Sequence, residues 1–182
     1  RQLSAIVPVV LEQAGFEATY SEGWWDKIIG GTAIYGVFWD GSKLGGLGDI
    51  AVEPVDILNL FWEPGVTKIQ NSANVFHVKL EDSAALEQAY PELAGKLGGN
   101  GLDISKYVYD DTVDTTEKSV VVDWYYKKKT GGKTVLHYCK FVGDTVLYAT
   151  ENKNGEGWYD HGKYPFVFDP MFRVKGTPCG FG

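Results

Sequence analysis

Residues 119–151 read SVVVDWYYKKKTGGKTVLHYCKFVGDTVLYATE, and this stretch decides the fold. It contains three runs rich in β-branched and aromatic residues, at 119–126, 133–142 and 145–151, and such runs are typical of strands. Glycine-containing connections separate the runs. The Gly143-Asp144 connection has two residues with glycine first, which is the pattern of a type II′ hairpin because that position needs a positive φ. The stretch therefore predicts a three-stranded antiparallel meander.

Upstream of the meander, the N-terminal part of the chain predicts two helices. Apolar residues recur at helical spacing over 3–14. Pro8 conflicts with this helix: either it lies in the first turn of a helix that begins later, or it kinks the helix. Ser21 can cap a second, short helix. Trp24 and Trp25 on this second helix are expected to lie in the core.

The segment between these helices and residue 100 predicts more strands and one further helix. The strand-like runs lie at 33–39, 50–55, 58–62 and 75–80. The first two flank a glycine-rich loop and predict a hairpin. Asp82 or Ser83 can cap a helix over 82–97, which Pro91 should interrupt.

A glycine-rich and then acidic segment, Gly98 to Asp114, is the candidate boundary between two lobes. Residues 1–100 would form a lobe with the N-terminal helix, the strands and the helix at 82–97. Residues 101–182 would hold the meander and a tail rich in aromatic residues, glycine and proline. The fold class expected is α+β, with antiparallel sheets or hairpins, a few short helices and two lobes.

Composition and charge restrict the classes of function. The formal net charge is −7, which opposes tight capture of nucleic acid because phosphates meet a repulsive mean field. Cys139 and Cys179 are the two cysteines, too few for a zinc ribbon or a disulfide framework, so a reduced cytosolic origin is favoured. No apolar run approaches the ~20 residues that span a bilayer, so no membrane partner is expected. The opening Arg1 and the ending of the tail predict a piece cut from a longer chain.

The residues that could carry catalysis or hold a cofactor form no recognisable set. His77, His137 and His161 share no short spacing, so a metal site would require all three to converge. Asp160-His161 invites a general-base interpretation, which would make the chain a hydrolase. An adjacent pair on a glycine-flanked turn more often forms local hydrogen bonds that fix the turn. No catalytic residue, cofactor or metal is therefore predicted.

A basic patch next to aromatic residues is the candidate contact with DNA phosphates. It comprises Lys127, Lys128, Lys129 and Lys133, and Trp124-Tyr125-Tyr126 stands immediately before it. Aromatic and basic residues together can grip single-stranded nucleic acid. The alternative is a solvated hairpin tip whose lysines keep an exposed edge from pairing. The six tryptophans allow a similar choice between a glycan-binding groove and core packing.

Four stretches, taken in order, resemble the portal protein of tailed bacteriophages. They are Gly30 to Asp40 (GGTAIYGVFWD); Gly48-Asp49-Ile50 with Glu53-Pro54-Val55-Asp56; Asn59 to Gly65 (NLFWEPG) followed by Ile69-Gln70 and Val75-Phe76; and Tyr159 to Phe166 (YDHGKYPF). Each stretch is short, but their order and spacing match that family over nearly the whole chain.

This resemblance implies a non-catalytic subunit of a usually dodecameric ring at one capsid vertex, through which double-stranded DNA enters and leaves without sequence-specific contact. It implies that the large terminase and head-completion or adaptor proteins are partners, and that the protein resides in the virion after assembly in the host cytoplasm. The chain lacks the family's long stem helices and C-terminal crown, so it should cover mainly the wing region, with the meander reaching toward the stem or clip. The alternative functions are a carbohydrate-binding or adhesion module of a phage tail and, less favoured, the hydrolase that would use Asp160 and His161.

Overall fold

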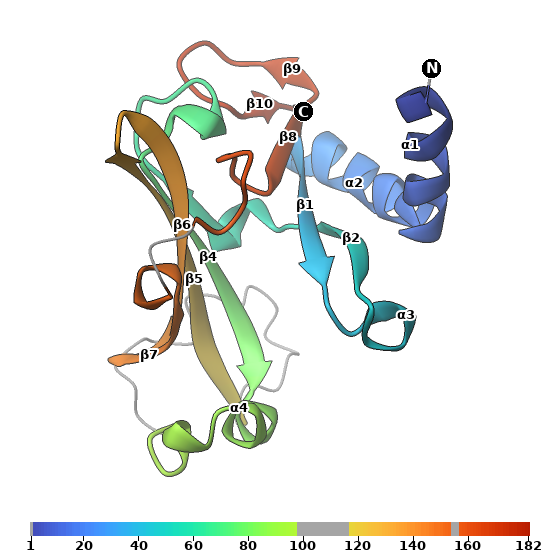
Figure 1. The fold of residues 1–182 in the computed structure, drawn as a ribbon. Helices are drawn as coiled ribbons and strands as arrows, with labels where there is room; N and C mark the ends of the chain where they lie inside the picture. Colours follow the sequence, from blue (N-terminus) through green and yellow to red (C-terminus); the bar gives the residue numbers. More distant parts are fainter. Residues whose placement is uncertain (1, 98–116, 154–156) are drawn as a thin grey trace. The chain divides into compact units, whose positions relative to one another are not determined.

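The computed structural model describes residues 2–97, 117–153 and 157–182 (Figure 1), which form an α+β fold with antiparallel sheets, as the sequence predicts. The described residues fall into two compact units. Unit 1 lies within 1–57, 64–71 and 165–182, and unit 2 lies within 58–63 and 72–164. The elements, in chain order, are α1 (Gln2–Gln13), α2 (Phe16–Gly30), β1 (Thr32–Asp40), α3 (Lys43–Gly46), β2 (Asp49–Pro54), β3 (Leu60–Trp62), β4 (Asn74–Asp82), α4 (Ser83–Ala89), β5 (Lys118–Thr130), β6 (Lys133–Val142), β7 (Thr145–Ala149), β8 (Phe166–Pro170), β9 (Phe172–Arg173) and β10 (Gly180–Phe181).

The predicted meander forms the main part of unit 2. Its strands β5, β6 and β7 pair antiparallel, and β4 and β3 extend them into a five-stranded sheet of order β3-β4-β5-β6-β7. The β5–β6 hairpin closes on Gly131-Gly132, both with positive φ, as a type I′ turn requires. Gly143 has φ 53°, which confirms the positive φ predicted for the first position of the β6–β7 turn.

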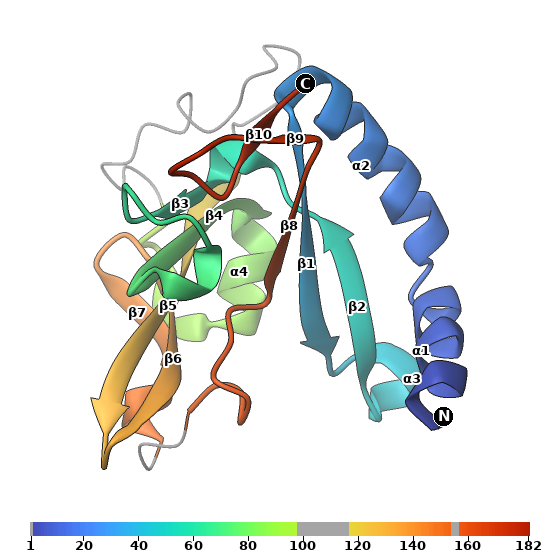
Figure 2. The same ribbon diagram turned by 90° about the horizontal axis from the view of Figure 1, so that it is seen from above.

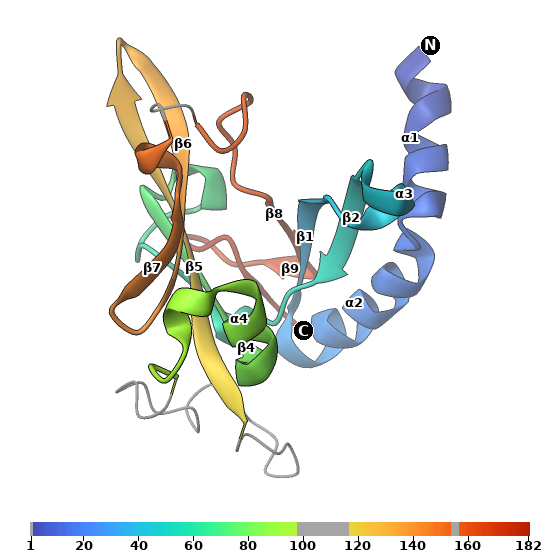
Figure 3. The same ribbon diagram turned by 60° about the horizontal axis from the view of Figure 1, so that its bottom comes forward.

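Helix α4 supplies the apolar layer of unit 2 at one end of this sheet, where Figure 3 shows it beside β4 and β5. Asp82 caps the helix by accepting a hydrogen bond from the Ala85 N–H at 3.0 Å, and the helix ends at Ala89, before Pro91. Leu86 on α4 and Val121 on β5 belong to one buried cluster. The predicted helix over 82–97 is therefore correct at its start and at its break.

Unit 1 contains a three-stranded antiparallel sheet of order β2-β1-β8, and α2 runs along it (Figure 2). The β1–β2 hairpin is the one predicted from the sequence. Strand β8 comes from the tail and pairs with β1 from Thr32↔Pro170 to Gly36↔Phe166.

The two units divide the chain differently from the predicted lobes 1–100 and 101–182. The predicted boundary segment, Gly98 to Asp114, lies outside the described residues. Strand β4 pairs with β5 over nine positions, so β4 shares a sheet with the meander and 72–97 belongs to unit 2, while 165–182 joins the N-terminal hairpin in unit 1. Composition marks loops along the chain, whereas distant strands that pair decide which segments fold together.

Helix α1 covers nearly the same residues as the predicted helix over 3–14, whereas α2 departs from the prediction in length and in what it buries. Pro8 lies inside α1, and α2 begins at Phe16, before the predicted cap Ser21, whose hydroxyl instead donates to the Glu17 carbonyl at 3.0 Å. Trp24 and Trp25, expected in the core, are exposed by 42% and 67%. The reason is that α2 packs through the opposite face, where its buried residues are Thr19, Gly23 and Lys27.

Within the part of the chain that the structure describes, no helix combines the length and apolar character needed to cross a membrane.

Candidate functional site

The four lysines predicted to contact DNA lie at the tip of the β5–β6 hairpin, but they do not form one patch. Consecutive strand residues point to opposite faces. Lys127 lies over the Tyr164 ring, with its Nζ 4.3 Å from the ring centroid, and burial lowers its pKa. Lys128 pairs with Glu151 instead. Lys129 and Lys133 are exposed beside the turn, and their contact with DNA phosphate stays a prediction.

The Asp160-His161 pair lies in a turn whose backbone the His161 side chain helps to fix. Gly162 has φ 62°, and its N–H donates to the Tyr159 carbonyl at 2.9 Å. The His161 Nδ1 accepts a hydrogen bond from the Lys163 N–H at 3.0 Å. This is the local hydrogen bonding expected from the sequence, and it occupies one of the two ring nitrogens that a general base could use.

The other two histidines are buried in unit 2 in separate surroundings. His77 lies on β4, while His137 on β6 shares a hydrogen bond of 3.1 Å between its Nδ1 and the Thr150 hydroxyl. Among the described residues, no group of three or more His, Cys, Asp or Glu side chains could hold a metal ion.

Burial of His77 leads to a testable dependence of stability on pH. Burial first, and the Lys79 charge second, lower the pKa of His77 to about 4, although Asp123 acts in the opposite direction. Below about pH 6.5 the unfolded chain therefore binds a proton that the folded chain does not. We expect the free energy of unfolding of unit 2 to fall by about 2 kcal/mol between about pH 7 and pH 5 through this group alone.

The measurement is urea denaturation at both pH values, compared between the parent chain and His77→Leu. The variant should lack about 2 kcal/mol of the pH dependence in this window. His161→Gln, which alters an exposed histidine, serves as the control and should keep the dependence. An unchanged slope in His77→Leu would contradict the assignment.

Unit 2 also contains a buried polar group that the sequence did not point out. Asp123 on β5 is buried, accepts a hydrogen bond from the Tyr138 hydroxyl at 2.6 Å, and pairs with the Lys79 ammonium at 3.1 Å. Burial and the Asp123 charge raise the pKa of Tyr138, so the hydroxyl remains a donor. An acid in the middle of a strand-like run, directly after Val120-Val121-Val122, was the one available signal, and its two partners come from neighbouring strands. The arrangement satisfies a buried carboxylate.

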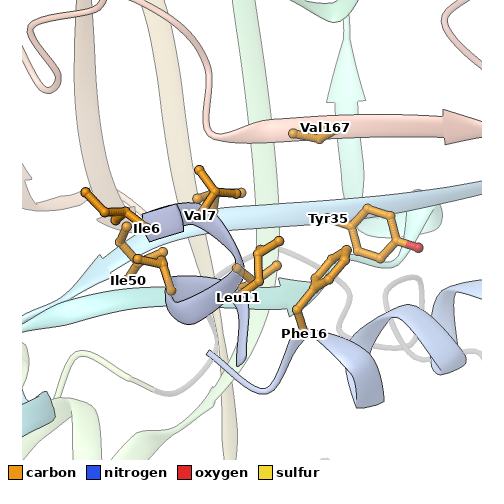
Figure 4. Close-up of a pocket in the computed structure, with 10 residues that line it drawn as sticks. Ile6, Val7, Leu11, Phe16, Tyr35, Ile50 and Val167 are labelled. Atoms are coloured by element: carbon orange, nitrogen blue, oxygen red, sulfur yellow. The ribbon is translucent and has the colours of Figure 1, made fainter. Parts of the chain in front are cut away.

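An apolar groove of about 470 Å³ lies in unit 1 between α1 and the sheet (Figure 4). Figure 4 shows Ile6, Val7 and Leu11 of α1 on one side of it, with Ile50 close to them and Val167 across from them. The ten residues that line it are all apolar or aromatic: Ile6, Val7, Val10, Leu11, Phe16, Tyr35, Val37, Ile50, Val52 and Val167. Several of these side chains are about half exposed, so the groove is open to solvent.

A second apolar surface of unit 1, which we call the α2 ridge, consists of Trp24, Trp25, Ile28 and Ile29. Each of these side chains is exposed, and Ile29 is exposed by 81%. Apart from Leu58, Phe61 and Val146, all of the large hydrophobic side chains that are exposed in the described residues belong to unit 1. Exposed apolar surface of this extent marks sites of interaction in soluble proteins.

Comparison with known proteins gives neither a matching family model nor a matching curated relative.

Proposed function

We propose that the chain is a non-catalytic structural subunit of a tailed-phage portal ring, the channel for DNA at a capsid vertex. The observation that carries the proposal is the concentration of exposed apolar surface on unit 1, in the groove and the α2 ridge. A subunit of a closed ring must bury surface against two neighbours, and an apolar surface left open on one subunit meets that requirement.

The placement of the four resembling stretches supports the same proposal. Residues 30–40 contain β1 and 48–56 contain β2, which form one hairpin, and 159–166 lead into β8, so the distant tail stretch joins these two in the sheet of unit 1. The remaining stretch contributes β3 and the start of β4 to the sheet of unit 2. Stretches that share one sheet form a single structural feature rather than scattered short likenesses.

The charge of the chain is compatible with passage of duplex DNA. Its formal net charge of −7 repels phosphates on average, so DNA can move past without being held. The proposed partners are copies of the same chain in a dodecameric ring, the large terminase, head-completion or adaptor proteins, and double-stranded DNA bound without sequence specificity. The proposed location is the virion.

Electron microscopy of the protein expressed from its complete gene tests this function. We expect rings with a central channel, and mass measurement should give a closed oligomer near twelve subunits. A protein that remains monomeric at all concentrations and salt conditions would overturn the proposal.

The exposed lysines give a separate prediction about DNA. We expect the double variant Lys129→Gln, Lys133→Gln to retain less DNA, with ring assembly unchanged. The slope of log affinity against log salt should fall by about one for each phosphate that the variant no longer neutralises. The matched control is Lys128→Gln, since Glu151 already pairs with that lysine. Equal retention by the double variant and the parent would remove these lysines from the DNA path.

Two exposed tryptophans favour a second candidate function, a carbohydrate-binding or adhesion module of a phage tail. Trp25 and Trp39 are exposed by 67% and 60%, and flat aromatic rings on a surface can stack on sugars. A glycan array separates the candidates, because binding that Trp39→Ala abolishes would support adhesion, whereas rings in the microscope would support the portal.

A further inference from the structure

The α2 ridge occupies the side of α2 that faces away from the sheet. Because an α-helix has about 3.6 residues per turn, the four ridge side chains fall within less than half of its circumference. Thr19, Gly23 and Lys27, the buried residues of α2, fall on the other half. The aromatic and aliphatic side chains therefore point outward from unit 1, where they form a convex apolar surface.

The groove is concave and lies between α1 and the sheet (Figure 4), whereas the ridge lies on the face of α2 opposite to its buried residues. Helix α1 holds its apolar residues over the sheet without closing on it, since Ile6 and Val7 are about half exposed and Val167 is too. The backbone joins α1 to α2 through Gly15 at φ 68°, a conformation that glycine adopts without strain. Unit 1 thus carries a hollow and a projection of the same apolar character.

The lining of the groove favours protein side chains over a small molecule as its occupant. Pockets for small ligands place a few polar groups that fix the orientation of the ligand. Tyr35 brings the only side-chain oxygen among the ten lining residues, and Figure 4 shows that its hydroxyl points away from the α1 residues. That hydroxyl lies close to Gly23 on α2, so it is directed under the helix rather than into the groove.

A cation also lies beside the ridge, since the Lys27 Nζ is 4.9 Å from the Trp24 ring centroid, but it already pairs with Asp169. The other charges considered beside the two surfaces are opposite in sign. Glu22 and Asp26 flank the ridge on α2, and burial, Asp56 and Glu22 together raise the pKa of Asp26, so a neighbouring cation would be favourable there. Lys43 lies at the groove, where its Nζ donates to the carbonyl of the lining residue Ile50 at 3.2 Å. Complementary charges of this kind select the orientation of two partners.

We propose that the occupant of the groove is the α2 ridge of a second copy of this chain, so that the copies associate head to tail. This inference rests on the proposed ring function and names the contact that builds the ring. A two-fold dimer would require both ridge–groove contacts to form at once between the same two copies. When only one forms, each copy keeps a free ridge or groove, and a repeated heterologous contact of this type gives a ring when its rotation closes.

Disulfide cross-linking of the complete protein tests the contact directly. Cys179 is half-buried and is first replaced by Ser, while the buried Cys139 is kept. Val7→Cys places a thiol in the groove, and Ile29→Cys places one on the ridge. Under oxidation, each single variant should give no covalent dimer, a mixture of the two should give dimers, and the double variant should give a ladder of covalent oligomers on non-reducing gels. A control pair, Val7→Cys with Lys129→Cys, should give no ladder.

The outcomes distinguish failure of the ridge–groove contact from failure of the proposed portal function. Rings that form without any cross-link between the two positions would overturn the contact and leave the portal function standing. Dimers from Ile29→Cys alone would overturn it in favour of a two-fold contact between ridges. A protein that never assembles would overturn both.

Charged substitutions give an independent measurement. We expect Ile29→Lys or Val7→Asp to reduce the ring fraction in sedimentation by at least about tenfold, with the same circular dichroism and melting temperature at low concentration, because both side chains are exposed. Val146→Lys, at an exposed valine of unit 2, is the matched control and should leave assembly intact. Equal ring fractions in all three variants would contradict the proposal.

Discussion

Replacement of Phe166 by Ala is expected to lower the free energy of unfolding of unit 1 by about 3–5 kcal/mol, the usual cost of removing a phenylalanine from a core. Phe166 begins β8 and is only 1% exposed. Its ring meets the Phe38 ring edge-to-face, with the centroids 5.9 Å apart. The alanine would leave a cavity next to β1, on the strand that the tail contributes to this sheet.

The next residue provides the matched control for this substitution. Val167 lies on the same strand with its side chain on the opposite face, and it is 53% exposed. Val167→Ala should therefore cost less than about 1 kcal/mol. Urea denaturation of the three chains at one protein concentration gives the comparison. A destabilisation below about 1 kcal/mol for Phe166→Ala would show that β8 does not hold unit 1 together.

The strand that Phe166 begins is also a part of unit 1 that the sequence does not predict. The meander could be predicted because its strands are consecutive and its turns carry their own chemistry, such as glycine at 143. Strand β8 could not be predicted, since its partner β1 lies more than a hundred residues away and only the fold brings Phe166 to Gly36. For the same reason, the two lobes were predicted as consecutive segments of the chain, whereas each observed unit combines segments from both predicted lobes.

Burial on helices was the least predictable feature of the candidate site. Trp24 and Trp25 are of a residue type that is common in cores, yet the face of α2 that packs against the rest of unit 1 consists of small and polar residues, and both tryptophans are exposed. A run of lysines likewise looks like one patch in sequence, whereas the strand turns Lys127 toward Tyr164 and Lys128 toward Glu151. In both cases the missing information is which face of the element meets the rest of the fold.

Asp169→Asn should destabilise unit 1 by about 3 kcal/mol, because the ion pair that it breaks joins α2 to β8 and leaves a buried charge behind. Lys27, its partner, has a side chain only 10% exposed, whereas that of Asp169 is 37% exposed. The Lys27 ammonium also lies 4.9 Å from the Trp24 ring centroid. Because this cation–π contact remains in Asp169→Asn and still stabilises the ammonium, the expected destabilisation is at the lower end of the range for buried pairs.

Substitution of the other partner, Lys27, should destabilise unit 1 much less. This difference between the two single variants is the sharper test. Lys27→Met leaves Asp169 in contact with water, so we expect a destabilisation of about 1 kcal/mol or less. The double variant Lys27→Met, Asp169→Asn removes the stranded charge and should be more stable than Asp169→Asn alone, with a coupling energy of about 2 kcal/mol in the double-mutant cycle. Thermal denaturation of the four chains at one concentration measures it. If Lys27→Met cost as much as Asp169→Asn, the effect would come from the broken ion pair itself, and burial of the ammonium would not be what makes the pair important.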